Sequence, residues 1–200
     1  MLIIGLTGSL GTGKTTVAKM FFDRGAKVLD ADAITHQLMR PKGAAVKPMV
    51  RHFGQGILRG QAIDRKRVSE IVFNDPRQLK KLCQIIHPLA AKEVKNIIRR
   101  LQKRRTRQIL IIDAPLLIEA GWHRLVDYLV VVRSNQRLQV RRTQGRMNIS
   151  KAQALKRIKA QMSIREKIRL ADIVIDNRGH LTNTKKQVNE IWQKLLRKKQ

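Results

Sequence analysis

Cysteine and aromatic residues are scarce in this chain of 200 residues. It has one cysteine, Cys83, and aromatic residues make up 4% of the sequence. A single cysteine excludes a disulfide bond within the chain and is typical of a reducing compartment. With so few rings the core must be built from aliphatic side chains.

Long apolar segments are also missing. No stretch of the chain approaches the roughly 20 apolar residues that a helix needs to span a bilayer. The N-terminal residues show no charged leader followed by a cleavage site. We therefore expect a cytoplasmic protein that does not associate with membranes.

Acidic residues are few beside basic ones, since 14 Asp and Glu face 43 Lys and Arg and leave a net charge of +29. Such a surplus favours anionic ligands. The densest basic clusters lie at residues 99–107, 133–146 and 196–199, and none is interleaved with the aromatic residues that single-strand binders use. Solvated helix faces and a small phosphate-rich substrate explain most of them, so we expect no specific nucleic-acid partner, although non-specific binding in vitro is expected.

The most informative motif lies at residues 5–16, with the sequence GLTGSLGTGKTT. Gly8, Gly13, Lys14 and Thr15 fill the spacing G-x-x-x-x-G-K-[ST] between an apolar run and a helix-like segment. Glycines allow a turn in which successive N–H groups point inward, and the following helix adds its positive end. Lys14 can reach the outer phosphates and Thr15 can ligate Mg²⁺. The motif predicts an ATP or GTP site, and an accidental glycine-rich turn is the weaker alternative.

Short apolar runs alternate with amphipathic helices along the chain. Strands are expected at residues 2–4, 26–29, 108–113, 128–132 and 171–177. This alternation, with an anion-binding turn after the first strand, predicts one α/β domain with a five-stranded parallel sheet covered by helices on both faces.

The region from residue 41 to 103 contains no convincing buried strand. It is expected to form amphipathic helices broken at residues 54–56, 60, 74–76 and 87–88, with Asp75-Pro76 as a helix start. We interpret it as a helical insertion that holds the second substrate, in a core made of residues of about 1–40 and 104–200.

An arginine-rich helix, a break and a second helix follow the fourth strand. The first helix is expected from residue 136 to about 146, the break at residues 145–150, and the second helix at residues 151–161 with Ser150 as its cap. This pattern is typical of a mobile lid, which we assign to residues of about 141–162.

Carboxylates follow two of the predicted strands. Asp30 and Asp32 come after the second strand and Asp113 after the third, and ligands bind at the carboxyl ends of parallel strands. Phosphoryl transfer needs a carboxylate to accept a proton, another to hold Mg²⁺, and arginine to neutralise charge. We choose Asp32 as the base. The alternatives are a pair of helix caps for Asp30 and Asp32, a plain loop residue for Asp113, and solvated side chains for Arg142 and Arg146.

Motifs spread over nearly the whole chain resemble those of the dephospho-coenzyme A kinase family. They comprise residues 4–8, 13–16, 28–32 (VLDAD), 52–54, 63–65, 71–76, 86–88 (IHP), 113–119 (DAPLLIE), 161–162 and 171–177 (ADIVIDN). The phosphate motif alone is unspecific, but the ordered combination of Asp-Ala-Asp, His-Pro, Asp-x-Pro-Leu-Leu-x-Glu and Ile-Asp-Asn is specific.

The resemblance implies a three-layer P-loop kinase fold with a helical CoA-binding region and a lid. It implies ATP- and Mg²⁺-dependent phosphorylation of the ribose 3′-hydroxyl of dephospho-CoA, the final step of coenzyme A synthesis. We expect such an enzyme to be a monomer.

The resemblance also assigns residues by matching position. The ATP site would comprise Gly8, Gly11, Thr12, Gly13, Lys14, Thr15, Thr16, Arg146 and Asn177, with Thr15 and Asp113 at the metal. The catalytic residues would be Asp32, which contacts the 3′-hydroxyl, together with Lys14 and Arg142. His87, Asp113, Pro115 and Leu116 would line the acceptor site, and Asn177 would lie near the adenine.

Some positions depart from the family pattern. His36 stands where the family often has arginine, and Met147-Asn148 replaces a commonly acidic-glycine pair at the lid tip. Two other hypotheses for the function compete with the resemblance. One is another small-molecule kinase of the shikimate or nucleotide type, and the other is a basic P-loop protein that binds nucleic acid.

Overall fold

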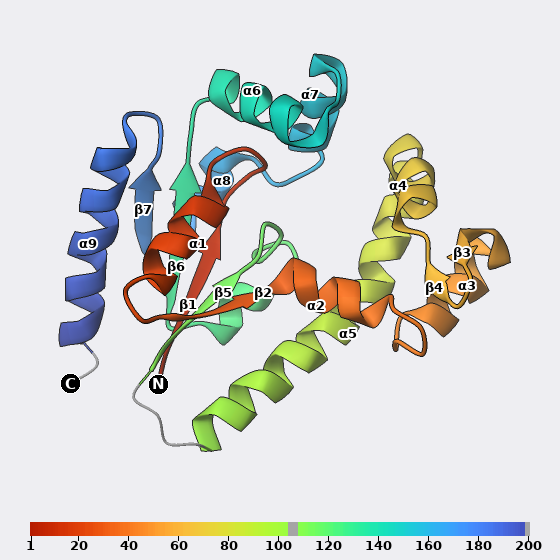
Figure 1. Cartoon of the computed structure of the whole chain (residues 1–200), viewed down its shortest axis with the longest axis horizontal. Coiled ribbons are helices and arrows are strands. Elements are labelled where there is room, and N and C mark those ends of the chain that lie inside the picture. Colours follow the sequence, from red (N-terminus) through yellow and green to blue (C-terminus); the bar gives the residue numbers. More distant parts are fainter. Residues whose placement is uncertain (104–107, 199–200) are drawn as a thin grey trace. The chain divides into compact units, whose positions relative to one another are not determined.

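A computed structural model describes residues 1–103 and 108–198, apart from the side chain of Phe73. Parts of the basic clusters at residues 99–107 and 196–199, and the predicted start of the second core segment at 104, lie outside the described residues. The chain divides into two compact units, Met1–Asp30 with Arg105–Gln200, and Ala31–Arg104. We call them the core unit and the helical unit (Figure 1).

The core unit contains the predicted sheet. Its strands are β1 (Leu2–Thr7), β2 (Lys27–Asp30), β5 (Ile109–Asp113), β6 (Tyr128–Arg133) and β7 (Ile173–Asp176). They lie in the order β2-β5-β1-β6-β7, and every neighbouring pair is parallel. The prediction of five parallel strands is confirmed, and β1 lies at the centre of the sheet.

Both faces of this sheet are buried, because alternate side chains of a strand point to opposite sides. Ile4 and Leu6 pack in one cluster with α1 (Lys14–Phe22) and α9 (Leu181–Arg197). Ile3, which points the other way, is also buried. On that side α8 (Ile164–Arg169) packs against β6 and lies behind the sheet in Figure 1, where α1 lies in front. The core unit therefore has the expected three layers.

Two helices follow β6, namely α6 (Gln136–Met147) and α7 (Lys151–Lys159). Ser150 caps α7 as predicted, since its Oγ accepts the Gln153 N–H at 3.2 Å while Gln153 Oε1 accepts the Ser150 N–H at 2.9 Å. The predicted break between the two helices is confirmed, but it begins at Asn148 and not at Gly145. Helix α6 continues to Met147 because one glycine costs a helix only about 1 kcal/mol, and its cap residue Asn148 adopts the left-handed conformation at φ 49°.

The helical unit contains four α-helices, a 3₁₀ turn and a small hairpin among its described residues. Their bounds are α2 (Ala31–Leu38), α3 (Val46–Phe53), β3 (Leu58–Arg59), β4 (Ala62–Ile63), α4 (Arg65–Asn74), α5 (Pro76–Lys103) and a 3₁₀ turn, η1 (Gln55–Ile57). The hairpin was not predicted, because strands of two residues are too short to show an alternating pattern. Gly60 provides its turn at φ 61°.

The predicted break at residues 87–88 is wrong. Helix α5 begins at Pro76, as predicted, and continues through Pro88 to Lys103. Proline removes one helix hydrogen bond and crowds the preceding turn. Along this helix Ile86, Ala90 and Val94 are buried at intervals of four residues, so packing of one face continues across the proline and holds the two halves together.

None of the helices in residues 1–103 and 108–198 is both long and apolar enough to cross a bilayer.

Candidate active site

The glycine-rich turn, residues 8–13, connects β1 to α1 in the core unit, and we call it the phosphate turn. Gly11 and Gly13 have φ angles of 76° and 89°, in the region that favours glycine. A Cβ atom at Gly8 would lie 2.8 Å from the hydroxyl oxygen of Thr12 and closer still to the carbonyl of Val132. The turn therefore needs glycine at each of these three positions, for conformation at two and for space at Gly8.

Side chains from distant elements brace the turn. The buried Asn177 donates its side-chain N–H to the Thr12 carbonyl at 2.8 Å, and its Oδ1 accepts the Thr184 hydroxyl at 2.9 Å. Arg142 lies with NH1 3.4 Å from the carbonyls of Gly11 and Thr12. The structure therefore brings two predicted site residues, Arg142 and Asn177, directly to the phosphate turn.

Lys14, at the start of α1, forms an ion pair with Asp113 at the end of β5. Their side chains are only 13% and 9% exposed, so water screens the pair weakly. Asp113 is also the register partner of Asp30 on the adjacent strand β2. The predicted meeting of carboxylates at this edge of the sheet is present for Asp30 and Asp113. Thr15 and Thr16 follow Lys14 and are exposed.

A buried lysine close to this pair was missed by sequence reasoning. The Lys167 side chain, on α8, has 0% exposure and donates to Glu119 Oε1 at 2.8 Å and to the Pro115 carbonyl at 2.7 Å. Burial lowers the pKa of Lys167, and the hydrogen bond to Glu119 opposes that shift. The Ser163-x-x-Glu166 spacing, which forms a capping box in the structure, could have predicted α8 but not the burial of its lysine.

The Lys167 contacts continue to the phosphate turn. The Pro115 carbonyl also accepts the Thr7 hydroxyl at 3.2 Å, and Glu119 Oε1 accepts the Met162 N–H at 3.0 Å. The neighbouring Gln161 accepts the Leu10 N–H on its Oε1 at 2.8 Å. Polar contacts thus link the turn, the loop after Asp113 and the segment between α7 and α8.

The remaining predicted site residues lie on α6, in the loop after β5 and in the helical unit. Arg146 is exposed in the last turn of α6, and Pro115 and Leu116 are half-buried in the loop after β5. Asp32 and His87 belong to the helical unit, where Asp32 is exposed in the first turn of α2 and His87 is half-buried in α5.

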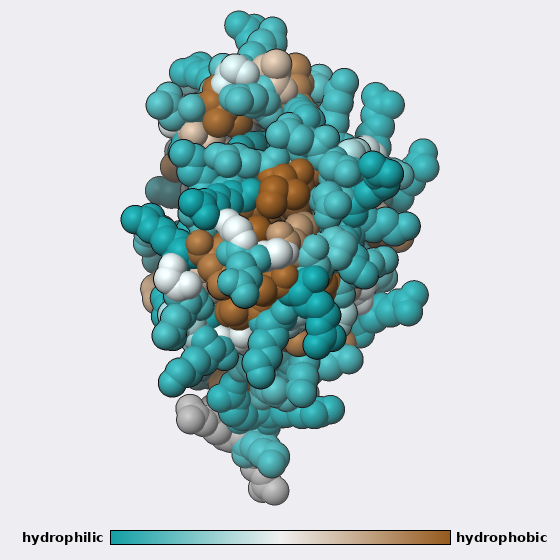
Figure 2. Space-filling model, turned by 90° about the vertical axis from the view of Figure 1, so that its right-hand side faces the viewer, coloured by the Kyte–Doolittle hydropathy of each residue, from teal (hydrophilic) through white to brown (hydrophobic). Residues whose placement is uncertain are grey.

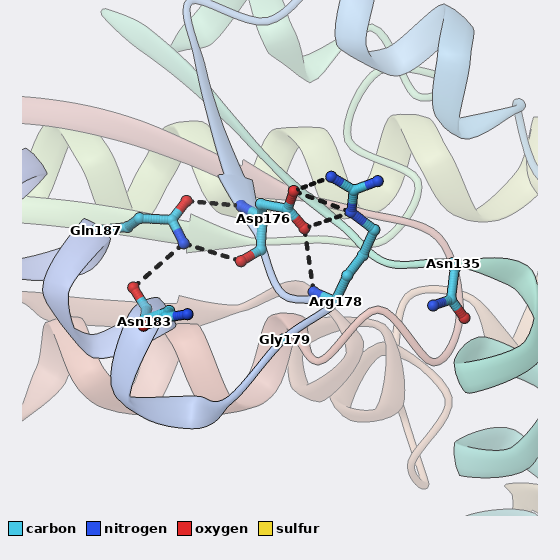
Figure 3. Close-up of a pocket in the computed structure, with 6 residues that line it drawn as sticks. All are labelled: Asn135, Asp176, Arg178, Gly179, Asn183 and Gln187. Atoms are coloured by element: carbon cyan, nitrogen blue, oxygen red, sulfur yellow. Dashed lines mark hydrogen bonds and ion pairs between the residues drawn. The ribbon is translucent and has the colours of Figure 1, made fainter.

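A pocket of about 600 Å³ lies at the end of β7 (Figure 3). It is lined by Asn135, Asp176, Arg178, Gly179, Asn183 and Gln187. Hydrogen bonds from Arg178, and a further one from Arg133 at 2.8 Å, lower the pKa of Asp176 to about 2. Gln187 fixes the Asp176 backbone through two hydrogen bonds of 2.9 Å. The carboxylate is therefore ionised and held in place beside the pocket.

A central parallel strand, a glycine-rich turn braced from several elements and a lysine at the start of the next helix define a P-loop nucleotide-binding protein of the kinase type. Within that class, the sequence matches the profile of dephospho-CoA kinases over residues 2–183. The chain belongs to the dephospho-CoA kinase family.

Individual relatives agree with this assignment. The chain is 42% identical to a dephospho-CoA kinase of Symbiobacterium thermophilum over 96% of its own length and 80% of the relative. The crystal structure of TT1252 from Thermus thermophilus is similar with a TM-score of 0.79, at 30% identity and 97% coverage of each chain. A dephospho-CoA kinase from Campylobacter jejuni is similar with a TM-score of 0.71, at 25% identity and 96% coverage of each chain.

Proposed function

We propose that this protein transfers the γ-phosphoryl group of ATP to the ribose 3′-hydroxyl of dephospho-CoA, giving CoA and ADP. The observation that carries the proposal is the P-loop whose lysine meets a carboxylate at the carboxyl edge of the sheet, in a chain of this family. A cytoplasmic location and a monomeric state fit a small biosynthetic enzyme of this kind.

The donor half of the site is assigned to the phosphate turn. Backbone N–H groups of Gly11, Thr12 and Gly13, with the N-terminus of α1, bind the phosphates. Lys14 contacts the outer phosphates when ATP is bound, so its ion pair with Asp113 is loosened or shared at that stage. Thr16 lies one residue further along α1 and contributes at the same end of the helix.

The oxygen ligands present fit a magnesium ion. Mg²⁺ prefers hard oxygen donors and takes only one or two protein ligands beside water and substrate phosphates. The exposed hydroxyl of Thr15 and the carboxylate of Asp113 supply donors of that chemistry. When bound, the ion neutralises charge on the phosphate oxygens.

The acceptor half is assigned to the residues that follow β2 and β5. Asp32 stands two residues after Asp30, the register partner of Asp113. We assign Asp32 as the group that accepts the 3′-hydroxyl proton, because positioning of the acceptor matters more than deep proton abstraction when the transition state is loose. His87, Pro115 and Leu116 complete this half of the site.

Arg142 and Arg146 are assigned to the lid, residues of about 141–162. Arginine there neutralises charge that develops on the transferring phosphoryl group. Arg142 already touches the phosphate turn, and Arg146 lies one helical turn further along α6. The helical insertion of about residues 41–103 binds the CoA portion of the acceptor.

We place the adenine of ATP beside Asn177. Its two neighbours in sequence, Asp176 and Arg178, line the pocket at the end of β7, whose volume lies within the range of small-ligand sites (Figure 3). Asn177 itself holds the phosphate turn, so this residue couples the base to the phosphates.

A coupled ADP-release assay tests the proposal against the two alternatives. We expect turnover with dephospho-CoA and less than about one hundredth of that rate with adenosine, AMP or shikimate. Turnover with one of those compounds and none with dephospho-CoA would overturn the proposal.

The face viewed in Figure 2 carries an apolar area among hydrophilic residues, which is suitable for the pantetheine portion of the substrate.

A further inference from the structure

The net charge of +29 is not explained by the kinase site. Among the described residues most acidic side chains are already engaged in the structure. Asp113 and Glu119 pair with buried lysines, Asp127 and Asp172 accept the backbone N–H groups of Ile3 and Leu129, and Asp64 and Glu166 cap helices. These carboxylates stabilise the fold locally, so the basic surface receives little compensation from them.

The longest described helix carries part of this surplus along one exposed face. A series of eight positions along α5 begins at Arg77 and advances by three or four residues each time, so its members lie on one face of the helix. Every position of this series is exposed, six of the eight are cationic and none is acidic: Arg77, Lys81, Gln84, Pro88, Lys92, Lys95, Arg99 and Lys103. We call this series the α5 stripe, and with a rise of 1.5 Å per residue it spans about 39 Å.

Most of the charge in the α5 stripe lacks an acidic partner on its own helix. Glu93 is the one acidic residue of α5, and it bonds Arg100, outside the stripe, at 3.1 Å. Arg77, at the first position, bonds Asp75. No ion pair among the described residues involves the four cations from Lys92 to Lys103. The free charge is therefore concentrated in the last three turns.

We propose that the α5 stripe binds the phosphate backbone of double-stranded nucleic acid without sequence preference. A duplex carries one negative charge for about every 1.7 Å of its axis, so the cations from Lys92 to Lys103, which extend over about 17 Å of helix, match a run of phosphates better than one small phosphate ligand. Lysine and arginine at helical spacing contact successive phosphates, and these contacts fix position without reading bases.

The composition of the stripe argues against other occupants. A helix that binds a membrane surface needs bulky apolar side chains beside its cations. Among the described residues the large exposed apolar side chains are Phe22, Ile71, Met147, Leu170 and Leu181, and none lies on α5. The stripe has no aromatic residue on which an unpaired base could stack. Both absences favour a duplex backbone.

The test is fluorescence anisotropy with labelled DNA and RNA duplexes of about 20 base pairs, at salt concentrations from about 50 to 200 mM. The stripe variant carries Lys81→Gln, Lys92→Gln, Lys95→Gln and Arg99→Gln. The control carries the same loss of charge on the exposed face of α9, through Lys185→Gln, Lys186→Gln, Lys194→Gln and Arg197→Gln. Glutamine is a good helix former, so both helices are expected to persist.

We expect the stripe variant to bind either duplex at least about tenfold more weakly than the unchanged protein, with the slope of log affinity against log salt reduced by about 3 to 4 for DNA. The control should stay within about threefold of the unchanged protein. Lys→Arg changes at Lys81, Lys92 and Lys95 preserve charge and should preserve binding.

Three results would overturn the proposal. The first is an equal loss in both glutamine variants, which would mean diffuse attraction by net charge. The second is absence of binding by the unchanged protein at about 150 mM salt. The third is binding to phosphatidylserine vesicles but to neither duplex, which would identify a membrane surface instead.

Discussion

Lys14 and Asp113, which are 99 residues apart in sequence, form an ion pair at the carboxyl edge of the sheet. One residue begins the helix after the phosphate turn, and the other ends the strand next to β1. Because both side chains are largely buried, each determines the electrostatic environment of the other. The pair connects the ATP-binding half of the proposed site to the carboxylates at the ends of β2 and β5.

Replacing Lys14 by alanine should lower turnover at least about a hundredfold, the range expected when a preorganised charge at a phosphoryl group is lost. The cause is removal of the cation that contacts the outer phosphates. Steady-state ADP release measures the effect. Lys19→Ala is the matched control, since Lys19 is exposed on the same helix and pairs with Asp23 at the surface. Comparable turnover in the two variants would contradict the role of Lys14.

Replacing Asp32 by asparagine should reduce turnover at least about a hundredfold through loss of the proton acceptor. Asp32 is exposed, so stability should change by less than about 0.5 kcal/mol. Rapid-quench kinetics with dephospho-CoA and ATP check the chemical step, with Asp23→Asn as a surface control. Near-normal turnover in Asp32→Asn would eliminate it as the base and favour the alternative of a helix cap.

Replacing Lys167 by methionine should lower the free energy of unfolding by about 3 to 5 kcal/mol, because it leaves Glu119 partly buried without its cation. Adding Glu119→Gln removes that charge and keeps an acceptor for the Met162 N–H, so the double variant should recover part of the loss. Urea unfolding of the single and double variants measures both values. A double variant less stable than Lys167→Met would show that the charge on Glu119 is not what destabilises the single variant.

Asp176 should make stability depend on acid pH. Its pKa is about 2 in the folded protein and 3.8 when unperturbed. The unfolded chain therefore binds the proton first as pH falls, so this stabilisation is present above about pH 4 and is lost between about pH 4 and 2. Asp176→Asn should lower stability by about 1 to 2 kcal/mol at neutral pH, allowing for partial exposure of the side chain. Unfolding curves at several pH values check this, and a difference that persists unchanged at pH 2 would contradict it.

Much of the fold could be predicted because its signals are local. The phosphate turn, the five strands and the Ser150 cap each depend on residues close together in sequence. The errors have the same origin. Pro88 and Gly145 are breakers by local rules, yet both helices continue through them. In α5 the packing of one face continues across Pro88, and in α6 a single glycine costs too little to end the helix. The two-residue strands of the β3-β4 hairpin carry too little pattern to be recognised.

The proposed site was predictable in part. Lys14 and Thr15 follow from the motif, and Asp30 and Asp113 follow from the rule that parallel strands end at one edge. The second role of Asn177, which holds the Thr12 carbonyl, depends on a contact over 165 residues and has no local signal. Lys167 is similar, because a lysine in a charged helix is expected at the surface unless a buried carboxylate receives it.

The sequence by itself determined where the glycine-rich turn forms, how many strands form the sheet and which family the motifs resemble, since each depends on short-range spacing or an ordered set of motifs. Only the tertiary structure decided which charges are neutralised inside and which remain outside. Lys14 and Lys167 are buried against carboxylates, whereas the α5 stripe faces solvent. The physical reason is that an ionised group enters a protein interior only where a distant part of the chain supplies its partner.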